Sequence, residues 1–162
     1  MPISIRPATV ADAPAAYELI RELAEYEKAP QEVTVSLEQF TDDGFGEQAR
    51  YRLLVAEQHN DTNNDKKVVG IALFFNSYST WKGKTIYLDD LVVAETYRRY
   101  GIGKQLINAL LDIARQENVN QVRWHVLDWN EPAIRFYEKM GVKMEPEWIT
   151  CKCEKNMLEQ SK

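Results

Sequence analysis

The sequence is poor in the side chains that bind metals and form disulfides. It contains two cysteines, Cys151 and Cys153, and two histidines, His59 and His125. Two cysteines so close together are too few for a disulfide framework or a zinc site. In a strand they would lie on one face, and we interpret them as small apolar core residues. The histidines are far apart in the sequence, and His125 is interpreted as structural rather than catalytic. We therefore expect no metal site.

Long apolar runs and an excess of positive charge are also missing. No stretch approaches the ~18 apolar residues of a membrane span, and residues 1–6 (MPISIR) lack the apolar core of a signal peptide. The expectation is a cytoplasmic protein that does not bind a membrane. The net charge of −5 argues against nucleic acid as a partner, which usually requires a basic face. It suits a cationic substrate, which negative potential attracts.

The length and the hydrophobic pattern predict one mixed α/β domain. The chain has 162 residues, 44% of them hydrophobic, which is enough for a single domain over residues 1–162 with its own core. The expected order is β-α-α-β-β-β-α-β-α-β. The strands are predicted at 3–6, 51–57, 68–78, 85–93, 121–127 and 148–153, and the helices at 9–26, 34–41, 106–117 and 130–140.

The most informative stretch is residues 85–111, which reads as a strand, a tight loop and a helix. The loop, residues 97–103 (YRRYGIG), contains two glycines and two arginines. Glycine lets the backbone adopt positive φ and lets a ligand approach closely. The first turn of the following helix presents unpaired N–H groups, and Arg98, Arg99 and Lys104 add positive charge. Together these features predict a phosphate site, although a simple strand-to-helix turn remains the alternative.

The loop lacks both the G-x-G-x-x-G of dinucleotide folds and a Walker motif. Residues 98–103 instead resemble the Arg-x-x-Gly-x-Gly pyrophosphate loop of the GNAT superfamily of N-acetyltransferases. This resemblance implies a single-domain fold with a mixed, mostly antiparallel sheet splayed between strands 4 and 5, a bulge in the strand before the loop, and acetyl-CoA as cosubstrate. The implied coenzyme contacts are Leu91, Val92, Val93, Arg98, Arg99, Tyr100, Gly101, Ile102, Gly103, Lys104, Asn130, Pro132, Ala133 and Tyr137.

Acetyl transfer to an amine needs a proton acceptor for the amine and a proton donor for the departing thiolate. Residues 128–137 (DWNEPAIRFY) resemble the superfamily's Asn…Phe-Tyr element, which implies that Tyr137 is the general acid. The alternative is that Tyr137 is a core residue on its helix's apolar stripe. Asp89 and Asp90 are the candidates on the amine side, because adjacent carboxylates in an apolar strand are costly to bury. Alternation puts them on opposite faces unless a bulge intervenes; a solvated strand end is the alternative.

A second resemblance covers nearly the whole chain. Segments 5–9, 23–27, 43–47, 87–90 and 129–132 are similar to the diamine (spermidine/spermine) N-acetyltransferases and their thialysine-type paralogues. This similarity implies a homodimer and a substrate site that includes Tyr26, Glu27, Asp89, Asp90 and Trp81. Three positions depart from the pattern: Asp89 replaces a glutamate, Arg99 a glycine and Ser79 an aspartate.

We therefore predict an N-acetyltransferase acting on a primary amine of a small polyamine, by direct attack in a ternary complex, with Tyr137 and Asp89 as catalytic residues. No cysteine lies in the loop or beside Tyr137, so a covalent acyl-enzyme has no obvious nucleophile. Residues 127–130 (LDWN) look closer to the thialysine type. Thialysine or a lysine-like amine is the alternative substrate, and a non-catalytic acetyl-CoA-binding module is the alternative role.

Overall fold

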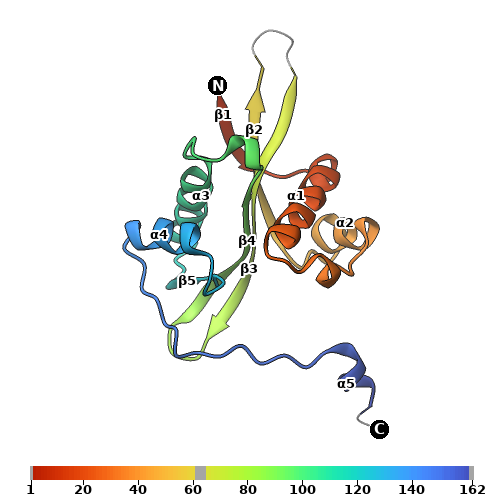
Figure 1. Cartoon of the computed structure of the whole chain (residues 1–162), viewed down its shortest axis with the longest axis vertical. Helices are drawn as coiled ribbons and strands as arrows, with labels where there is room; N and C mark the ends of the chain where they lie inside the picture. Colours follow the sequence, from red (N-terminus) through yellow and green to blue (C-terminus); the bar gives the residue numbers. More distant parts are fainter. Residues whose placement is uncertain (1, 61–64, 161–162) are drawn as a thin grey trace. The chain divides into compact units, whose positions relative to one another are not determined.

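The computed structural model describes residues 2–60 and 65–160, and its contacts form two compact units, Met1–His125 and Val126–Lys162 (Figure 1). No helix in this described part is long and apolar enough to cross a membrane. Unit 1 contains strands β1 (Ile3–Pro7), β2 (Arg52–His59), β3 (Lys66–Ser79), β4 (Gly83–Val93) and β5 (Gln121–Arg123), helices α1 (Ala13–Tyr26), α2 (Leu37–Phe45) and α3 (Ile102–Gln116), and 3-10 turns Val10–Asp12, Pro30–Glu32 and Glu95–Tyr97; unit 2 contains α4 (Glu131–Lys139) and α5 (Lys155–Glu159).

The five strands form one sheet in the order β1-β2-β3-β4-β5. Neighbours are antiparallel except β4 and β5, which are parallel. This confirms the expected α/β class with a mixed, mostly antiparallel sheet. β5 is shorter than the predicted strand 121–127, because it pairs with β4 only along Thr85–Tyr87. The two strands part just before an irregularity in β4, so among the described residues the rest of this β4 edge has no strand partner.

Helices cover both faces of the sheet (Figure 1), and each face has its own apolar core. On one face, α3 packs on side chains that include Phe74, Ile86 and Leu88. On the other, α1 and α2 pack on a second cluster that includes Ile71, Leu73 and Val92. Apolar side chains spaced along α3 (Ile102, Leu106, Ile107, Leu110 and Ala114) are buried, which follows from their helical periodicity.

β4 contributes to both cores because it contains a β-bulge. Leu73 of β3 pairs with Asp90, and Phe74 pairs with Leu88, so Asp89 is an extra residue on β4. An inserted residue shifts the alternation of side chains by one position. Ile86 and Leu88 therefore face α3, whereas Val92, which would share their face in a regular strand, packs beneath α1 and α2. The bulge expected in this strand is present.

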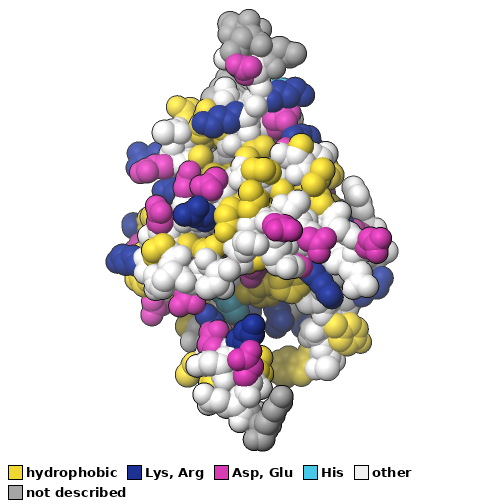
Figure 2. All heavy atoms as spheres, turned by 90° about the vertical axis from the view of Figure 1, so that its right-hand side faces the viewer, with side chains coloured by type: hydrophobic (Ala, Val, Ile, Leu, Met, Phe, Trp, Pro, Cys, Tyr) yellow, Lys and Arg dark blue, Asp and Glu magenta, His cyan; other side chains and the backbone are white. Residues whose placement is uncertain are grey.

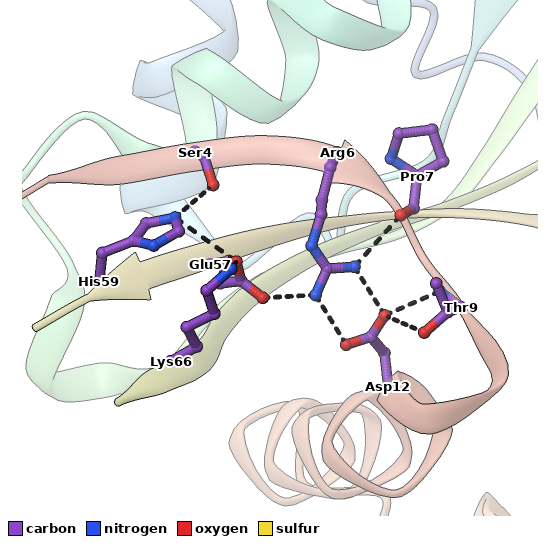
Figure 3. Close-up of polar contacts among 8 residues, drawn as sticks. All are labelled: Ser4, Arg6, Pro7, Thr9, Asp12, Glu57, His59 and Lys66. Carbon is purple, nitrogen blue, oxygen red and sulfur yellow. Dashed lines mark hydrogen bonds and ion pairs between the residues drawn. The ribbon is translucent and has the colours of Figure 1, made fainter. Parts of the chain in front are cut away.

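A clasp of charged residues holds β1 to the start of α1 (Figure 3). The two terminal nitrogens of Arg6 donate to Asp12 at 2.8 and 3.0 Å, and Nη2 also donates to Glu57 of β2. Asp12 accepts from the backbone N–H of Thr9 at 2.7 Å, which confirms the helix start predicted there. Arg6 holds the pKa values of Asp12 and Glu57 below their usual range.

In unit 2, the predicted strand at 148–153 is wrong. These residues have no regular secondary structure, and the large side chains Trp148 and Ile149 are 67% and 86% exposed. Cys151 and Cys153 are exposed rather than core residues. A strand needs a neighbour to satisfy its backbone groups, and the described part of unit 2 contains no strand to supply one.

Candidate active site

The loop between β4 and α3 has the backbone that an anion cradle requires. Gly101 caps α3 with φ 75°, and Arg99 also has positive φ, at 70°. A Cβ on Gly101 would meet nothing within 4 Å, so the left-handed conformation alone accounts for glycine here. The substitution of Arg99 for the usual glycine leaves a bulky residue in the same strained region.

The chemistry of this loop fits a diphosphate. Arg98, Arg99, Tyr100 and Lys104 are exposed, and the first-turn N–H groups of α3 have no carbonyl one turn earlier to bond. Amides, the positive end of the helix dipole and cationic side chains therefore meet beside the open space at Gly101. The residues present fit the pyrophosphate of a coenzyme A molecule.

Arg98 joins this loop to β4 and to the end of α1. Its Nε donates to the carbonyl oxygen of Val93 at 3.1 Å, and its guanidinium lies over the ring of Tyr26, 5.3 Å from the centroid. Tyr26 is the last residue of α1, and Glu27 follows it. The cation–π contact thus places a predicted substrate residue against a predicted coenzyme residue.

The other predicted half of the site is an acidic cavity on the α1–α2 side of the sheet. The cavity has a volume of about 370 Å³, and both Asp89 and Asp90 line it, because the bulge overrides the alternation that would separate them. Figure 2 faces α1 and α2 and shows acidic side chains spread among apolar ones. The described lining contains four carboxylates and no lysine or arginine: Ile20, Glu32, Val33, Thr34, Val35, Phe40, Asp43, Tyr51, Leu73, Asp89 and Asp90.

The carboxylates near β4 bind protons more tightly than usual. Burial, together with the charges of Asp89 and Glu27, raises the pKa of Asp90 to about 7. Burial also raises the pKa of Asp89, while the charge of His125 lowers it, and burial raises the pKa of Glu27. A cation entering this cavity would relieve the repulsion among these charges, so the site is suited to a protonated amine.

A cavity of about 410 Å³ on the α3 side of the sheet is a weaker candidate. Its carboxylate, Glu117, already forms an ion pair with Arg52, with Nη2 and Oε1 2.7 Å apart. Its described lining contains no second carboxylate and no residue of the loop 97–103. Its volume is similar, but its carboxylate already has a cationic partner.

The remaining predicted residues belong to other elements. Trp81 is in the β3–β4 turn, 82% exposed, and does not line the acidic cavity. Leu91, Val92 and Val93 follow the bulge along the β4 edge that β5 leaves. In unit 2, Asn130 caps α4 by accepting from the N–H of Ala133 at 3.4 Å, and Pro132 lies in the first turn of this helix. Tyr137 is buried, at 8% exposure, beside Phe136.

Of the lining residues the sequence pointed only to Asp89 and Asp90; among those it missed are Glu32 of the 3-10 turn Pro30–Glu32, Asp43 of α2 and Tyr51 just before β2. The resemblance at residues 43–47 was a signal for Asp43. A Cβ on Gly44 would lie 2.3 Å from the Tyr51 ring, so the glycine is needed for this ring to pack on α2. The sequence also did not predict the contact between His125 and Tyr87, two residues that are distant in the chain.

Known proteins resemble this chain along most of its length. A profile described as Acetyltransferase (GNAT) family matches residues 14–142. The thialysine N-epsilon-acetyltransferase of Bos taurus is 42% identical over 143 residues, which cover 87% of this chain and 84% of the relative. The spermidine/spermine N(1)-acetyltransferase-like protein 1 of Homo sapiens is 32% identical over 138 residues, covering 85% of this chain and 20% of that protein. An integron cassette protein of V. cholerae has the same fold, with a TM-score of 0.77 at 24% identity over 99% of this chain and 97% of that chain.

Proposed function

This chain belongs to the acetyltransferase (GNAT) family and is an acyltransferase, and from this premise we propose that it acetylates a primary amine of a small polycation such as spermidine or spermine. The observation that carries the proposal is the acidic cavity beside the β4 bulge. Four carboxylates at different places on its wall suit a ligand with several ammonium groups. None of the described lining residues offers a cation to a substrate carboxylate.

Thialysine is the second candidate, and the names of the relatives favour it. An amino acid carries a carboxylate, which is costly to bury without a cationic partner. In a cavity lined by Glu32, Asp43, Asp89 and Asp90, this carboxylate would meet like charge. The cavity therefore supports the polyamine over the amino acid.

The residues that would hold acetyl-CoA are those of the loop and the adjoining β4 edge. The α3 amides, Arg98, Arg99 and Lys104 would bind the diphosphate. The open edge at Leu91–Val93 would pair with the amide groups of the pantetheine arm. When bound, acetyl-CoA supplies an acetyl group already activated as a thioester.

The chain's own side chains would accept one proton from the substrate and donate another to the departing thiolate. Asp89 has a pKa raised by burial, which makes it a better acceptor for a proton of the substrate ammonium. Asp90, with its pKa of about 7, would stabilise a second positive charge. Tyr137 would donate the proton that the departing thiolate requires, and direct attack by the amine needs no enzyme nucleophile.

A turnover screen tests the substrate class. Free thiol release is measured with acetyl-CoA and spermidine, spermine, a diamine, thialysine or lysine. We expect the highest kcat/KM with the polyamines. Asp90→Asn should raise KM for spermidine, whereas Glu38→Gln, an exposed acidic residue of α2 outside the cavity, should not. A clear preference for thialysine would replace the polyamine with the second candidate.

Tyr137→Phe tests the proton donor. Removing a general acid typically lowers turnover by about 100-fold or more, with little change in KM for acetyl-CoA. Phe136→Leu, a neighbouring change on α4, controls for altered packing. Unchanged turnover in Tyr137→Phe would remove the acid assignment. A cytoplasmic homodimer completes the proposal, and light scattering of the purified protein tests its oligomeric state.

A further inference from the structure

Three aromatic rings connect the elements that surround the acidic cavity. Phe40 of α2 is buried, and its ring contacts those of Tyr17 of α1 and Tyr51, just before β2, with centroid distances of 5.7 and 5.1 Å. α1 and α2 lie side by side on this face of the sheet (Figure 1). Phe40 and Tyr51 line the cavity, whereas Tyr17 is not among the described lining residues and has no part in the proposed function so far.

Both phenols also hydrogen-bond to the backbone of one cavity wall, which consists of residues 32–35 and α2 and is called the opposite wall because the other carboxylates lie on β4. Oη of Tyr17 donates to the carbonyl oxygen of Val35 at 2.7 Å, and Oη of Tyr51 donates to that of Phe40 at 2.5 Å. Burial and the charge of Asp43 raise the pKa of Tyr51, so this phenol keeps its proton at neutral pH. The two bonds hold the opposite wall to α1 and to the start of β2.

The opposite wall supplies two of the four carboxylates of the cavity. Glu32 lies three residues before Val35, and Asp43 lies on α2, whereas Asp89 and Asp90 belong to β4. Apolar side chains of α1 and β3 line the cavity as well. A polyamine carries ammonium groups separated by methylene chains. One ammonium can therefore bind at β4 and a second at the opposite wall, while the methylenes cover the apolar lining.

The position of Glu32 depends on the hydrogen bond at Val35. The backbone N–H groups of Glu32 and Val33 donate to carbonyl oxygens only three residues earlier, at 3.0 and 3.4 Å, and residues 33–36 are neither helix nor strand. The bond from Tyr17 instead links this segment to a helix position 18 residues away. Without it, the segment would have to be ordered when the ligand binds, at a cost in conformational entropy.

We propose that Tyr17 is a positioning residue that fixes Glu32 for the second ammonium group of the substrate and so makes this enzyme prefer polyamines to monoamines. The inference rests on the proposed function and leaves its reaction unchanged. Tyr51 holds the helix of Asp43 in the same way. Neither phenol reaches the reacting atoms in this proposal, so the effect of Tyr17 appears in KM for the amine rather than in kcat.

Steady-state kinetics with two amines tests this preference. Tyr17→Phe removes the phenol donor and keeps the ring beside Phe40. We expect KM for spermidine to rise about threefold to tenfold, as for one lost hydrogen bond. KM for propylamine, which has the aminopropyl end of spermidine and no second charge, should not change, and neither should KM for acetyl-CoA. Tyr78→Phe, at an exposed tyrosine of β3, is the control and should change none of these values. An equal rise for both amines, or no rise for spermidine, would overturn the proposal.

A double-mutant cycle tests whether Tyr17 acts through Glu32. Glu32→Gln alone should raise KM for spermidine, but in a Tyr17→Phe background it should add little, because the carboxylate is no longer held in place. Fully additive effects would contradict the positioning role.

Hydrogen exchange of the wild-type protein needs no variant. With coenzyme A bound, spermidine should protect the amides of Glu32 and Val33 more than propylamine does at equal saturation. Equal protection by the two amines would overturn the second-ammonium contact. If the wild-type protein instead prefers thialysine or acetylates no amine, the proposed function itself fails.

Discussion

Replacing Asp90 with asparagine should make this protein more stable, by an amount that grows as the pH rises from about 4 to about 7. Asp90 is half-buried on β4 and faces α1 and α2. Burial and the charges of Asp89 and Glu27 raise its pKa from 3.8 to about 7. Asparagine has nearly the same shape and no charge, so Asp90→Asn removes the repulsion while it keeps the packing.

The size of the effect follows from the linkage between proton binding and folding. A raised pKa means that the folded protein holds this proton over a pH range in which the unfolded chain has released it. The parent's stability therefore falls as pH rises from about 4 to about 7 and then levels off. A shift of about three units at ~1.4 kcal/mol each gives an upper bound of roughly 4 kcal/mol. Asp90→Asn should recover most of this free energy above pH 7 and almost none near pH 4.

Urea unfolding, followed by circular dichroism at several pH values, measures this difference. Asp128→Asn, at an exposed aspartate, controls for the chemical change itself. In a third variant, Asp89→Asn, the pKa of Asp90 should fall because a neighbouring charge is gone. This variant should therefore lose less stability between about pH 4 and 7 than the parent does. A stability gain in Asp90→Asn that is equal at all pH values, or a loss above pH 7, would refute the reasoning.

Three further predictions concern the loop and the clasp. Gly101→Ala should destabilise the fold by about 1–2 kcal/mol in urea unfolding, purely from its positive φ, and full stability would contradict this. Arg99→Gly should raise the free energy of unfolding by roughly 0.5–1 kcal/mol, because it relieves the left-handed backbone at this position, and it should also weaken coenzyme A binding measured by calorimetry. Arg99→Ala should weaken this binding without raising the stability. Arg6→Met should lower the free energy of unfolding by roughly 3 kcal/mol at pH 7. Because Arg6 lowers the pKa values of Asp12 and Glu57, this loss should shrink as pH falls below about 4, and a pH-independent loss would argue against the clasp.

The elements that local patterns specify were predictable, and those that depend on distant partners were not. The strand–loop–helix from Thr85 through α3 follows from β-branched residues, glycines and helical spacing, and the structure confirms it. Residues 148–153 have the composition of a strand, but composition cannot supply the neighbour that a strand requires. The position of the bulge depends on how Leu73 and Phe74 of β3 pair with β4, which no pattern within β4 determines.

The cavity combines residues that local patterns single out with residues that only the fold brings together. Asp89 and Asp90 stood out because charges are rare in an apolar strand, but alternation alone would have separated them. The contact between Tyr87 and His125 joins positions 38 residues apart and left no local signal. The chemical properties of these side chains can be read from the sequence, whereas their proximity depends on the register of the sheet.

The inserted residue in β4 also constrains how this protein can evolve. Deleting Asp89 would exchange side chains between the two apolar layers along one half of the strand, so selection for a folded chain preserves the extra residue at this position whatever amine is used. The opposite wall of the cavity, formed by α2 and residues 32–35, has no such structural constraint. Divergence in substrate preference among descendants of this gene should therefore accumulate on that wall, while the strand stays fixed.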